Sequence, residues 1–441
     1  MPQNSTGVAP SFLFRLYRAA TGVLLPFAYR KVARKLAVQG LDKIHQRERL
    51  GHASVPRPQM EAGGSLIWFH GASVGESQAA LILINQLAHH LPQARFLLTA
   101  GTATAAKLAK QRMPQSCHFQ FAPLDSVGPV RRFLGHWRPD AAIFVDSELW
   151  PVTLVEARNS GAVLALVNAR LSERSIARWR KRSSTARFIL DQFTLLMPQN
   201  EMVAEALLSL GAAKERILPG GNLKAAAAAL PVSDDLVSKL RQDLQGRPVW
   251  VASSTHKGEE EIILQTHTAL LETHPDLCLV LAPRHPERGA QIVDLIRGNG
   301  LEVAQRSKTE QIDAKTKVYL ADTLGELGNW YHLSPIVFLG GSLVPVGGHN
   351  PFEVALANAA VLTGPETFNF AETFPEMIAT GAAQTVKDAQ SLAMAVDNWL
   401  KQPQELNQAR QAARRFTRDQ AAQLDDLVHH LIEGLALQRS Q

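Results

Sequence analysis

The stretch SLIWFHGASVGE, residues 65–76, contains the clearest structural signal in this chain of 441 residues. Six mostly apolar residues, 65–70, are followed by a turn of small residues and then by a carboxylate, Glu76, in a helical stretch. A continuous apolar run, in contrast to an alternating one, is typical of a parallel strand that is buried on both faces. The stretch therefore predicts a strand, a tight turn and a helix, which form one repeating unit of an α/β fold.

The same unit recurs in two sets along the chain. After 65–70, the first set has apolar runs typical of strands at 95–99, 141–145, 163–167 and 194–198. The second set has them at 249–252, 277–282, 318–320, 336–339 and 360–363. Two successive α/β sets predict two doubly wound, Rossmann-like domains that face each other across a cleft.

These patterns divide the chain into five expected segments. A stretch without a predicted strand, with polar residues and proline, separates the two α/β sets and is interpreted as a linker. After about residue 392 the pattern is helical to the end. The expected segments are an N-terminal helical segment at 1–60, a first Rossmann-like domain at 61–224, the linker at 225–246, a second Rossmann-like domain at 247–392, and C-terminal helices at 393–441.

Composition and charge exclude several classes of protein. The chain has only two cysteines, Cys117 and Cys278, which excludes a disulfide scaffold and a zinc site built from cysteines. The net charge is +6, but residues 1–50 hold nine Lys and Arg against two acidic residues, which leaves −1 for the rest. A basic head on a nearly neutral body is not the pattern of a nucleic-acid-binding protein.

The basic head contains an interrupted apolar run, FLFRLYRAATGVLLPFA, at residues 12–28. A spanning helix needs about 20 mostly apolar residues, whereas this run includes Arg15, Arg18 and Pro26. The dense basic cluster at 30–35 follows the apolar run, unlike the charges of a signal peptide. We therefore expect an amphipathic helix that lies at a membrane surface. A helix packed only on its own protein and a true membrane span are the alternatives.

Ligands bind at the carboxyl ends of the strands in open α/β sheets, and the first set carries polar residues there. Glu76 follows strand 65–70 and either caps its helix or acts as a general base. Asp146 and Glu148 follow strand 141–145. Further on, residues 170–182 hold six Lys and Arg and one acidic residue, so they form either a solvated helix face or a contact for phosphates or membrane anions.

The second set has its own polar strand ends. Arg284, just after strand 277–282, suits a phosphate oxygen, and residues 322–327 begin a helix after strand 318–320. A glycine-rich segment, 340–353, ends in Asn350, Pro351, Phe352 and Glu353. Glycines let a ligand approach the backbone, and a carboxylate in the first turn of a helix can accept hydrogen bonds from two sugar hydroxyls. This is the ribose clamp of glycosyltransferases that use nucleotide sugars.

Seven motifs, taken together in their order and spacing, resemble the 3-deoxy-D-manno-octulosonic acid (Kdo) transferase family, whose members are membrane-associated, inverting glycosyltransferases of the GT-B fold. The resemblance extends from about residue 10 to the end of the chain. One departure is Gly71, where the family often has alanine; because both residues are small, we expect little effect. The motifs are WFHGASVGE, SELWP, NARLS, GNLK, ASSTHKGEE, APRHPER and GGHNPFE.

The resemblance implies transfer of Kdo from CMP-Kdo to the lipid A precursor (lipid IVA) in lipopolysaccharide core biosynthesis, at the cytoplasmic face of the cell inner membrane. It implies that Glu76 is the base that activates the acceptor, and that Glu148 and Lys224 stabilise the transition state. The domain at 61–224 would bind the acceptor and the domain at 247–392 the CMP-sugar. The implied CMP-binding residues are Pro283, Arg284, Leu324, Gly325, Glu326, Asn350, Pro351, Phe352 and Glu353.

The expected partners are the CMP-Kdo donor, the lipid A precursor and an anionic inner-membrane surface, and we expect no cofactor. A CMP-sugar has one phosphate in its leaving group, so a divalent metal that clamps a diphosphate is not needed, and no Asp-x-Asp signature follows a strand. Lysine, arginine and helix N-termini can stabilise the departing phosphate instead.

Two other classes of protein share part of this pattern. A GT-B-fold epimerase acting on a UDP-sugar would have the same glycine and carboxylate loops, but it has no need of a basic, apolar head. A non-catalytic membrane adaptor would explain the head, but it would not explain polar loops at strand ends in both sets.

Overall fold

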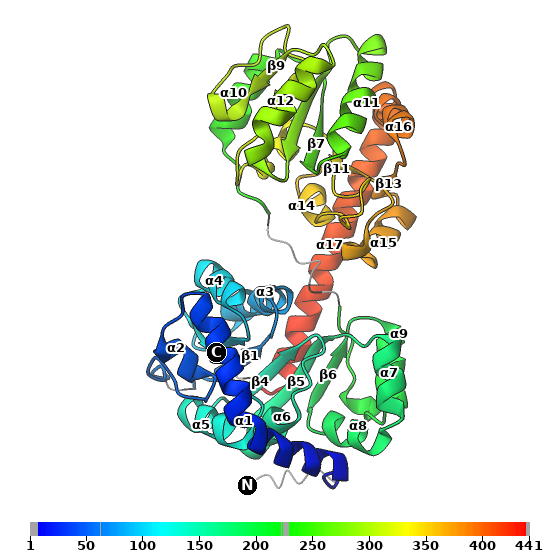
Figure 1. Cartoon of the computed structure of the whole chain (residues 1–441). Coiled ribbons are helices and arrows are strands. Elements are labelled where there is room, and N and C mark those ends of the chain that lie inside the picture. Colours follow the sequence, from blue (N-terminus) through cyan, green and yellow to red (C-terminus); the bar gives the residue numbers. More distant parts are fainter. Residues whose placement is uncertain (1–7, 62, 222, 224–228, 438–441) are drawn as a thin grey trace. The chain divides into compact units, whose positions relative to one another are not determined.

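The computed structural model describes residues 8–437 except 62, 222 and 224–228. The chain forms two compact α/β units (Figure 1). Unit 1 contains residues 1–224 together with 422–441, and unit 2 contains residues 225–421. The long helix α17 (Pro403–Gly434) therefore contributes its first part to unit 2 and its last part to unit 1.

Unit 1 is built on a parallel sheet whose strand order is β3-β2-β1-β4-β5-β6. All five residues of β1 are buried, as the continuous apolar run predicts. The order reverses between β1 and β4, and such a switch point is where open α/β sheets bind ligands. The strands are β1 (Leu66–His70), β2 (Arg95–Ala100), β3 (Cys117–Phe121), β4 (Ala141–Val145), β5 (Val163–Ala169) and β6 (Leu195–Pro198).

Helices cover both faces of this sheet (Figure 1). On one face α3 packs against α4, and on the other α5 packs against α6, with α1 beside them. The helices are α1 (Phe12–Val38), α2 (Lys43–Glu48), α3 (Val74–His90), α4 (Ala103–Arg112), α5 (Val127–Trp137), α6 (Pro151–Asn159), α7 (Glu173–Arg180), α8 (Ser183–Leu190) and α9 (Glu201–Ser209).

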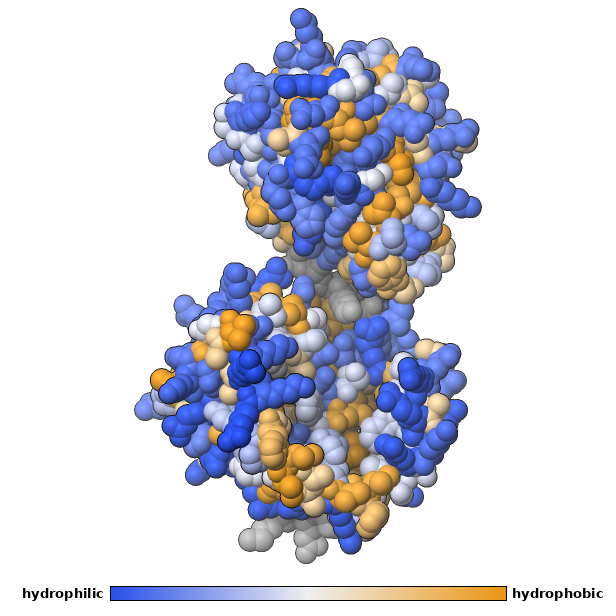
Figure 2. All heavy atoms as spheres, viewed as in Figure 1, coloured by the Kyte–Doolittle hydropathy of each residue, from blue (hydrophilic) through white to orange (hydrophobic). Residues whose placement is uncertain are grey.

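Helix α1 forms over the predicted apolar run and is attached to unit 1 along one side. Phe14 is buried and its ring lies 4.9 Å from the ring of Phe188, while the Tyr17 hydroxyl donates to Asp125 at 2.9 Å. Large apolar side chains elsewhere on the helix are exposed, including Phe12 and Phe27 at 78% and 68%. Figure 2 shows this apolar surface over α1. Within the described residues, no helix is long and apolar enough to cross a membrane.

The expected amphipathic pattern of α1 is not what the exposed residues display. The exposed large apolar residues lie between Phe12 and Phe27, apart from Val38 at the end, whereas the basic cluster follows at 30–35. Arg15 and Arg18 lie within the apolar part of the helix, and the densest basic cluster follows that part along the helix axis. Phe14 and Leu36, both buried, anchor the two ends of the helix on unit 1.

Unit 2 repeats the architecture with a parallel sheet in the order β13-β12-β11-β7-β8-β10-β9. Its first strand, β7, lies between β11 and β8, so the carboxyl ends of these three strands are neighbours. The strands are β7 (Val249–Thr255), β8 (Cys278–Pro283), β9 (Val303–Gln305), β10 (Val318–Leu320), β11 (Ile336–Leu339), β12 (Ala360–Thr363) and β13 (Ala383–Thr385). The helices before α17 are α10 (Asp234–Leu244), α11 (Glu259–Thr273), α12 (Gly289–Gly298), α13 (Leu327–Leu333), α14 (Pro351–Leu356), α15 (Thr373–Ala379) and α16 (Ala389–Lys401).

The expected linker at 225–246 contains a helix that belongs to the second unit. Helix α10 occupies Asp234–Leu244, and its buried residues Leu240 and Leu244 are part of the unit 2 core beside Tyr331. Its first turn is capped by Ser233, whose side chain accepts from the Leu236 amide. Just before the helix, Leu230 packs against the same core and the Ser233 amide donates to Asn329 at 2.7 Å.

Candidate active site

Glu76 lies in the first turn of α3, directly after the tight turn that follows β1. Its carboxylate accepts a hydrogen bond from the Ser73 amide at 3.0 Å, and the Ser73 hydroxyl accepts from the Glu76 amide at 3.3 Å. This reciprocal arrangement is a capping box, so the capping role expected from the sequence is confirmed. The side chain is only half-buried, so its second oxygen can also serve chemistry.

Glu148, in the loop after β4, is held by two neighbours. The indole Nε1 of Trp150 donates to its carboxylate, and His70 Nε2 lies 3.5 Å from the same oxygen. His70 is the last residue of β1, and its Nδ1 lies 2.9 Å from the Thr99 hydroxyl. The Thr99 hydroxyl also donates to the Phe69 carbonyl at 3.3 Å and accepts from the Trp68 indole at 2.8 Å, so His70 is held between this polar group and Glu148. Sequence reasoning did not assign this role to His70.

The two carboxyl groups form an interacting pair with opposite pKa shifts. Burial raises the pKa of Glu76, and the negative charges of Glu148 and Asp146 add to this, against the hydrogen bonds from Ser73. Burial alone would also raise the pKa of Glu148, but its interactions with His70 and Trp150 lower it overall. The raised pKa of Glu76 suits an acid or base, and the lowered pKa of Glu148 favours its charged form.

A strained polar connection lies beside this pair. Asp146 and Asn168 both adopt positive φ, of 62° and 52°, at the ends of β4 and β5. The Asn168 side chain donates to Asp146, and its oxygen accepts from the Leu223 amide at 3.4 Å. Non-glycine residues in this conformation cluster at functional sites. Lys224, the other predicted stabilising residue, lies outside the described residues.

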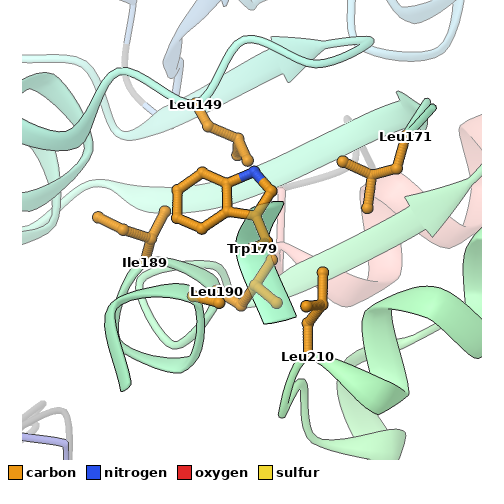
Figure 3. A pocket seen from close by; sticks show the side chains of 7 residues that line it. Leu149, Leu171, Trp179, Ile189, Leu190 and Leu210 are labelled. Atoms are coloured by element: carbon orange, nitrogen blue, oxygen red, sulfur yellow. The ribbon is translucent and has the colours of Figure 1, made fainter. Parts of the chain in front are cut away.

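An apolar pocket lies close to two of the sequence motifs in unit 1 (Figure 3). Leu149 of SELWP and Leu171 of NARLS lie around it, together with the indole of Trp179 from α7. Buried side chains from α8 and the loop after α9 complete the lining, namely Ala186, Ile189, Leu190 and Leu210. The pocket is small and its described lining is entirely apolar, so it offers apolar contact and not a reaction centre.

The basic residues at 170–182 lie on α7 or next to it in the sequence, and Trp179 of the same helix lines the pocket. All six are exposed, and none of them forms a salt bridge with a described carboxylate. An uncompensated cluster of positive charge attracts anions. The six residues are Arg170, Arg174, Arg178, Arg180, Lys181 and Arg182.

In unit 2, the glycine-rich loop after β11 is already occupied by a carboxylate of the protein itself. Buried Glu259, at the start of α11, accepts hydrogen bonds from the amides of Gly341, Ser342 and Leu343 at 2.7–3.0 Å. It also accepts from the amide of His256 at 2.9 Å. These amides are therefore not available to a phosphate, and the glycines at 340–341 make a closed loop instead of an open cradle. In the sequence, this arrangement is marked by Gly258 followed by Glu259, the pair at which α11 begins.

Arg284 and Pro283 lie at the carboxyl end of β8, as predicted. Arg284 is exposed, and its backbone amide donates to the Thr255 carbonyl at 3.0 Å, which ties it to the end of β7.

Glu326, in contrast to Arg284, already has partners within the protein. Its carboxylate binds the guanidinium of Arg306 at 2.7 and 3.0 Å and also accepts from Thr323.

These contacts limit how the loop at 324–326 can meet a ligand. The hydrogen bond to Arg306 is the largest cause that lowers the pKa of Glu326, so its charge is fixed and compensated. Gly325 has a φ of +81°, and the Leu324 side chain is 79% exposed. A nucleotide at this loop would meet its backbone and Leu324 before it met the Glu326 carboxylate.

The segment 350–353 forms the first turn of helix α14. The Asn350 side chain caps the helix by accepting from the Phe352 amide at 3.1 Å, and it donates to Glu353 at 3.2 Å. Pro351 and Phe352 are buried, and the Phe352 ring stacks on Phe416 with centroids 5.5 Å apart. The four predicted CMP contacts in this segment therefore divide into a polar pair and two core residues. Within the described part of the chain, no group of three His, Cys, Asp or Glu is arranged to hold a metal ion.

Comparisons with known proteins agree with this architecture. A family model described as 3-deoxy-D-manno-octulosonic-acid transferase (kdotransferase) matches residues 45–227. A probable mitochondrial 3-deoxy-D-manno-octulosonic acid transferase of Arabidopsis thaliana is 36% identical over 413 residues, which cover 91% of each chain. The enzyme of that name from Haemophilus influenzae is 36% identical over 79% of this chain and 80% of its own.

Among solved structures, UDP-GlcNAc 2-epimerase from Neisseria meningitidis superimposes with a TM-score of 0.56. It is 15% identical and covers 85% of this chain and 99% of its own, a likeness that shows the fold alone. The two parallel sheets and the polar strand ends thus define a GT-B-fold protein. The sequence relationships are more specific: the chain belongs to the 3-deoxy-D-manno-octulosonic acid transferase family, whose members are glycosyltransferases. This confirms the resemblance and favours a Kdo transferase over the epimerase and the adaptor.

Proposed function

We propose that this chain is an inverting glycosyltransferase that moves Kdo from CMP-Kdo to the lipid A precursor, lipid IVA, in lipopolysaccharide core biosynthesis. The observation that carries the proposal is the carboxyl pair Glu76–Glu148 at the switch point between β1 and β4. Unit 1 binds the acceptor and unit 2 binds the CMP-sugar.

Glu76 acts as the general base. A base works best when its pKa lies near the working pH, and burial beside Glu148 raises the pKa of Glu76 in that direction. The carboxylate takes the proton of an acceptor hydroxyl while that oxygen attacks the anomeric carbon of Kdo. The bond from this carbon to the phosphate oxygen breaks on the opposite side, and its electron pair leaves with CMP. One displacement at the anomeric carbon inverts its configuration.

Glu148 remains ionised and supports the positive charge that develops on the sugar in the transition state. The hydrogen bond from Trp150 and the contact with His70 Nε2 hold the carboxylate in place before the substrate arrives. A charge that is already oriented needs no reorganisation during the reaction, and this is the main source of electrostatic catalysis. Lys224 completes this role as a cation for the departing phosphate.

In unit 2, Arg284 supplies positive charge for the CMP phosphate, and Glu353 accepts hydrogen bonds from the ribose hydroxyls. Asn350 supports this arrangement because it both caps α14 and donates to Glu353. Pro283, Leu324, Gly325 and Glu326 shape the nucleotide site through their backbone or apolar atoms, and Pro351 and Phe352 fix the position of α14.

The acceptor is a lipid with sugar phosphates, and unit 1 offers features for both parts of it. The partly buried side chains of Leu149, Leu171 and Trp179 offer apolar contact to an acyl chain, and the basic residues around α7 suit phosphates (Figure 3). The exposed apolar part of α1 and the basic cluster at 30–35 would hold the protein at the cytoplasmic face of the inner membrane, which carries anionic lipid.

The direct test is to incubate the purified protein with CMP-Kdo and tetraacylated lipid A precursor in detergent. We expect a product heavier than the acceptor by one or more Kdo residues, with an anomeric configuration opposite to that in the donor. Glu76→Gln should give no product under the same conditions. A product with retained configuration would contradict the single-displacement mechanism. Conversion of a UDP-sugar to its epimer, with no transfer of Kdo, would contradict the whole proposal.

A further inference from the structure

Three histidines meet at the carboxyl edge of the unit 2 sheet. His256 directly follows β7, His285 comes two residues after β8, and His349 lies in the loop after β11, and these three strands are neighbours. The rings of His256 and His349 are stacked with their centroids 5.2 Å apart, and the His285 ring meets His256 edge-on at 5.6 Å. None of the roles assigned above includes them.

The His256–His349 pair is joined by a direct hydrogen bond, with its Nε2 atoms 2.9 Å apart. The surrounding loops fix this geometry from two sides. Buried Glu259 accepts from the His256 amide and from the Gly341 amide, and so ties the two loops together. Gly341 has a φ of +67°, and a Cβ there would come within 3.0 Å of the His349 ring. Because glycine has no side chain, residue 341 leaves room for the His349 ring.

A hydrogen bond between two Nε2 atoms has a fixed proton count. One ring donates and the other accepts, so only one hydrogen lies between them. In the neutral pair, one Nδ1 then carries a hydrogen and the other does not. Neither Nδ1 has a hydrogen-bond partner among the described residues. If the pair gains one proton, both Nδ1 atoms become donors and the pair becomes a cation, while the shared hydrogen bond is kept.

Burial, more than the surrounding charges, disfavours protonation of the pair in the absence of a ligand. Burial lowers the pKa of His349 to about 4, and His256, Arg284 and His285 add to the effect. Burial also lowers the pKa of His256, with Glu259 and Glu260 acting in the opposite direction. Both carboxylates are engaged elsewhere: Glu259 by backbone amides and Glu260 by Arg288 at 2.7 Å. An anion near Arg284 would reverse the balance and favour protonation.

We propose that the His256–His349 pair takes up one proton when the donor nucleotide binds, and donates from its Nδ1 atoms to the phosphate. This inference rests on the proposed function, in which Arg284 and its neighbours bind CMP. The phosphate of a CMP-sugar carries one negative charge, and the released CMP carries a second. A protonated pair in contact with this group stabilises the additional charge as the bond to the sugar breaks.

The probe is the methyl ester of CMP, a phosphodiester that does not itself titrate near neutral pH. Its binding is measured by calorimetry in buffers of different ionisation enthalpy between pH 6 and 8, which gives the number of protons taken up. We expect net uptake of up to one proton by the unaltered protein, and an affinity that rises as the pH falls. His349→Gln and His256→Gln, which keep an amide near the Nε2 position, should abolish the uptake and weaken binding by about 10- to 100-fold.

His285→Gln is the matched control, because His285 contacts the pair but lies outside the shared hydrogen bond and is about half exposed. This variant should keep the proton uptake. A complex that forms without proton uptake, or uptake that persists in both pair variants, overturns the inference while leaving the donor site intact. Loss of uptake in His285→Gln alone would assign the proton to that residue and also overturn it. If the unaltered protein does not bind the ester, the proposed donor site itself fails. Either pair variant is sufficient if thermal unfolding shows that the other does not fold.

Discussion

Gly71 lies against the main chain of Glu76, so closely that a Cβ at position 71 would come within 2.8 Å of the Glu76 carbonyl carbon. The expectation that alanine would be equivalent at this position is therefore wrong for this backbone. The neighbour is main chain and not a flexible side chain, so it cannot move without moving the start of α3. The position of the proposed base thus depends on the absence of a side chain five residues earlier.

Replacing Gly71 with alanine should displace Glu76 and reduce both stability and transfer. Overpacking of this kind typically costs about 1–3 kcal/mol in the free energy of unfolding. The measurements are thermal unfolding and the rate of Kdo transfer. Gly75→Ala is the matched control, because a Cβ at Gly75 would meet nothing within 4 Å. It should leave transfer unchanged and, as a helix position, should not destabilise the protein. Equal behaviour of the two variants would contradict the role of Gly71.

Glu76→Gln should abolish most transfer but leave the fold intact. Glutamine can still accept the Ser73 amide hydrogen bond of the capping box, whereas it cannot take a proton from the acceptor. Loss of a general base typically reduces the rate by about 10²–10⁴-fold. Glu201→Gln, at an exposed position in the first turn of α9, is the control and should be active. A Glu76→Gln variant that keeps more than half of the turnover would show that this carboxyl only caps its helix.

The acid limb of the pH profile should follow the pKa of Glu76. The base must be ionised, and since its pKa is raised by burial and by Glu148, kcat/KM should begin to fall at a pH above the ordinary range of glutamate, about 4.3. Glu148→Gln removes one of these causes, so the limb should move to lower pH even though the rate falls. Glu173→Gln, an exposed carboxyl on α7, should not move it. If the acid limb of the Glu148→Gln variant stays at the same pH, the charge of Glu148 does not help to set the pKa of Glu76.

Arg284→Ala and Glu353→Ala should each weaken CMP binding, the first through a lost charge at the phosphate and the second through lost ribose hydrogen bonds. A hydrogen bond to a charged group contributes about 1.5–3 kcal/mol, which is roughly 10- to 100-fold in affinity. Calorimetry with CMP measures this directly. Arg297→Ala, at an exposed position near the end of α12, is the control for general loss of charge. If both test variants bind CMP with unchanged affinity, the donor site does not lie at the loops of Arg284 and Glu353.

The fold was predictable because the sequence of a parallel strand that is buried on both faces is a continuous run of apolar residues. The three strands that sequence reasoning missed, β3, β9 and β13, all lie at the edges of their sheets. In β3, the polar residues His118 and Gln120 interrupt the apolar pattern, and β9 and β13 are only three residues long. Helix α10 was missed for a related reason, because only one face of it is apolar and the charged residues of the other face resemble a linker.

The candidate site was predictable in its residue types but not in its internal contacts. Glu76 and Glu148 were identifiable because they follow strands, but their opposite pKa shifts depend on His70, Trp150 and burial, which only the fold brings together. In the same way, the glycine-rich loop was interpreted as open to a ligand. Its amides are instead bound by Glu259, which lies more than 80 residues earlier in the sequence.

Membrane binding should depend on the four basic residues that end helix α1, namely Arg30, Lys31, Arg34 and Lys35. Each basic residue near an anionic bilayer contributes about 1 kcal/mol, so the loss of four such contacts should weaken binding by about a thousandfold. Replacing all four with glutamate should therefore release the protein from anionic vesicles in a flotation assay. Binding of the unaltered protein should weaken in high salt, because screening shortens the reach of exposed charges. Transfer to a detergent-dispersed acceptor should survive, since none of the four lies near Glu76 in sequence or among the proposed CMP contacts.

Two controls separate charge from apolar contact in this assay. Reversal of Lys107, Lys110 and Arg112, which are exposed on α4, should leave flotation nearly unchanged. Serine in place of Phe12, Leu16 and Phe27, which are exposed on the first part of α1, should weaken the salt-resistant part of binding, because their apolar area would no longer be removed from water. Full flotation of the charge-reversed variant would contradict the electrostatic contribution. Full flotation of the serine variant in high salt would show that α1 does not supply the apolar contact with the bilayer.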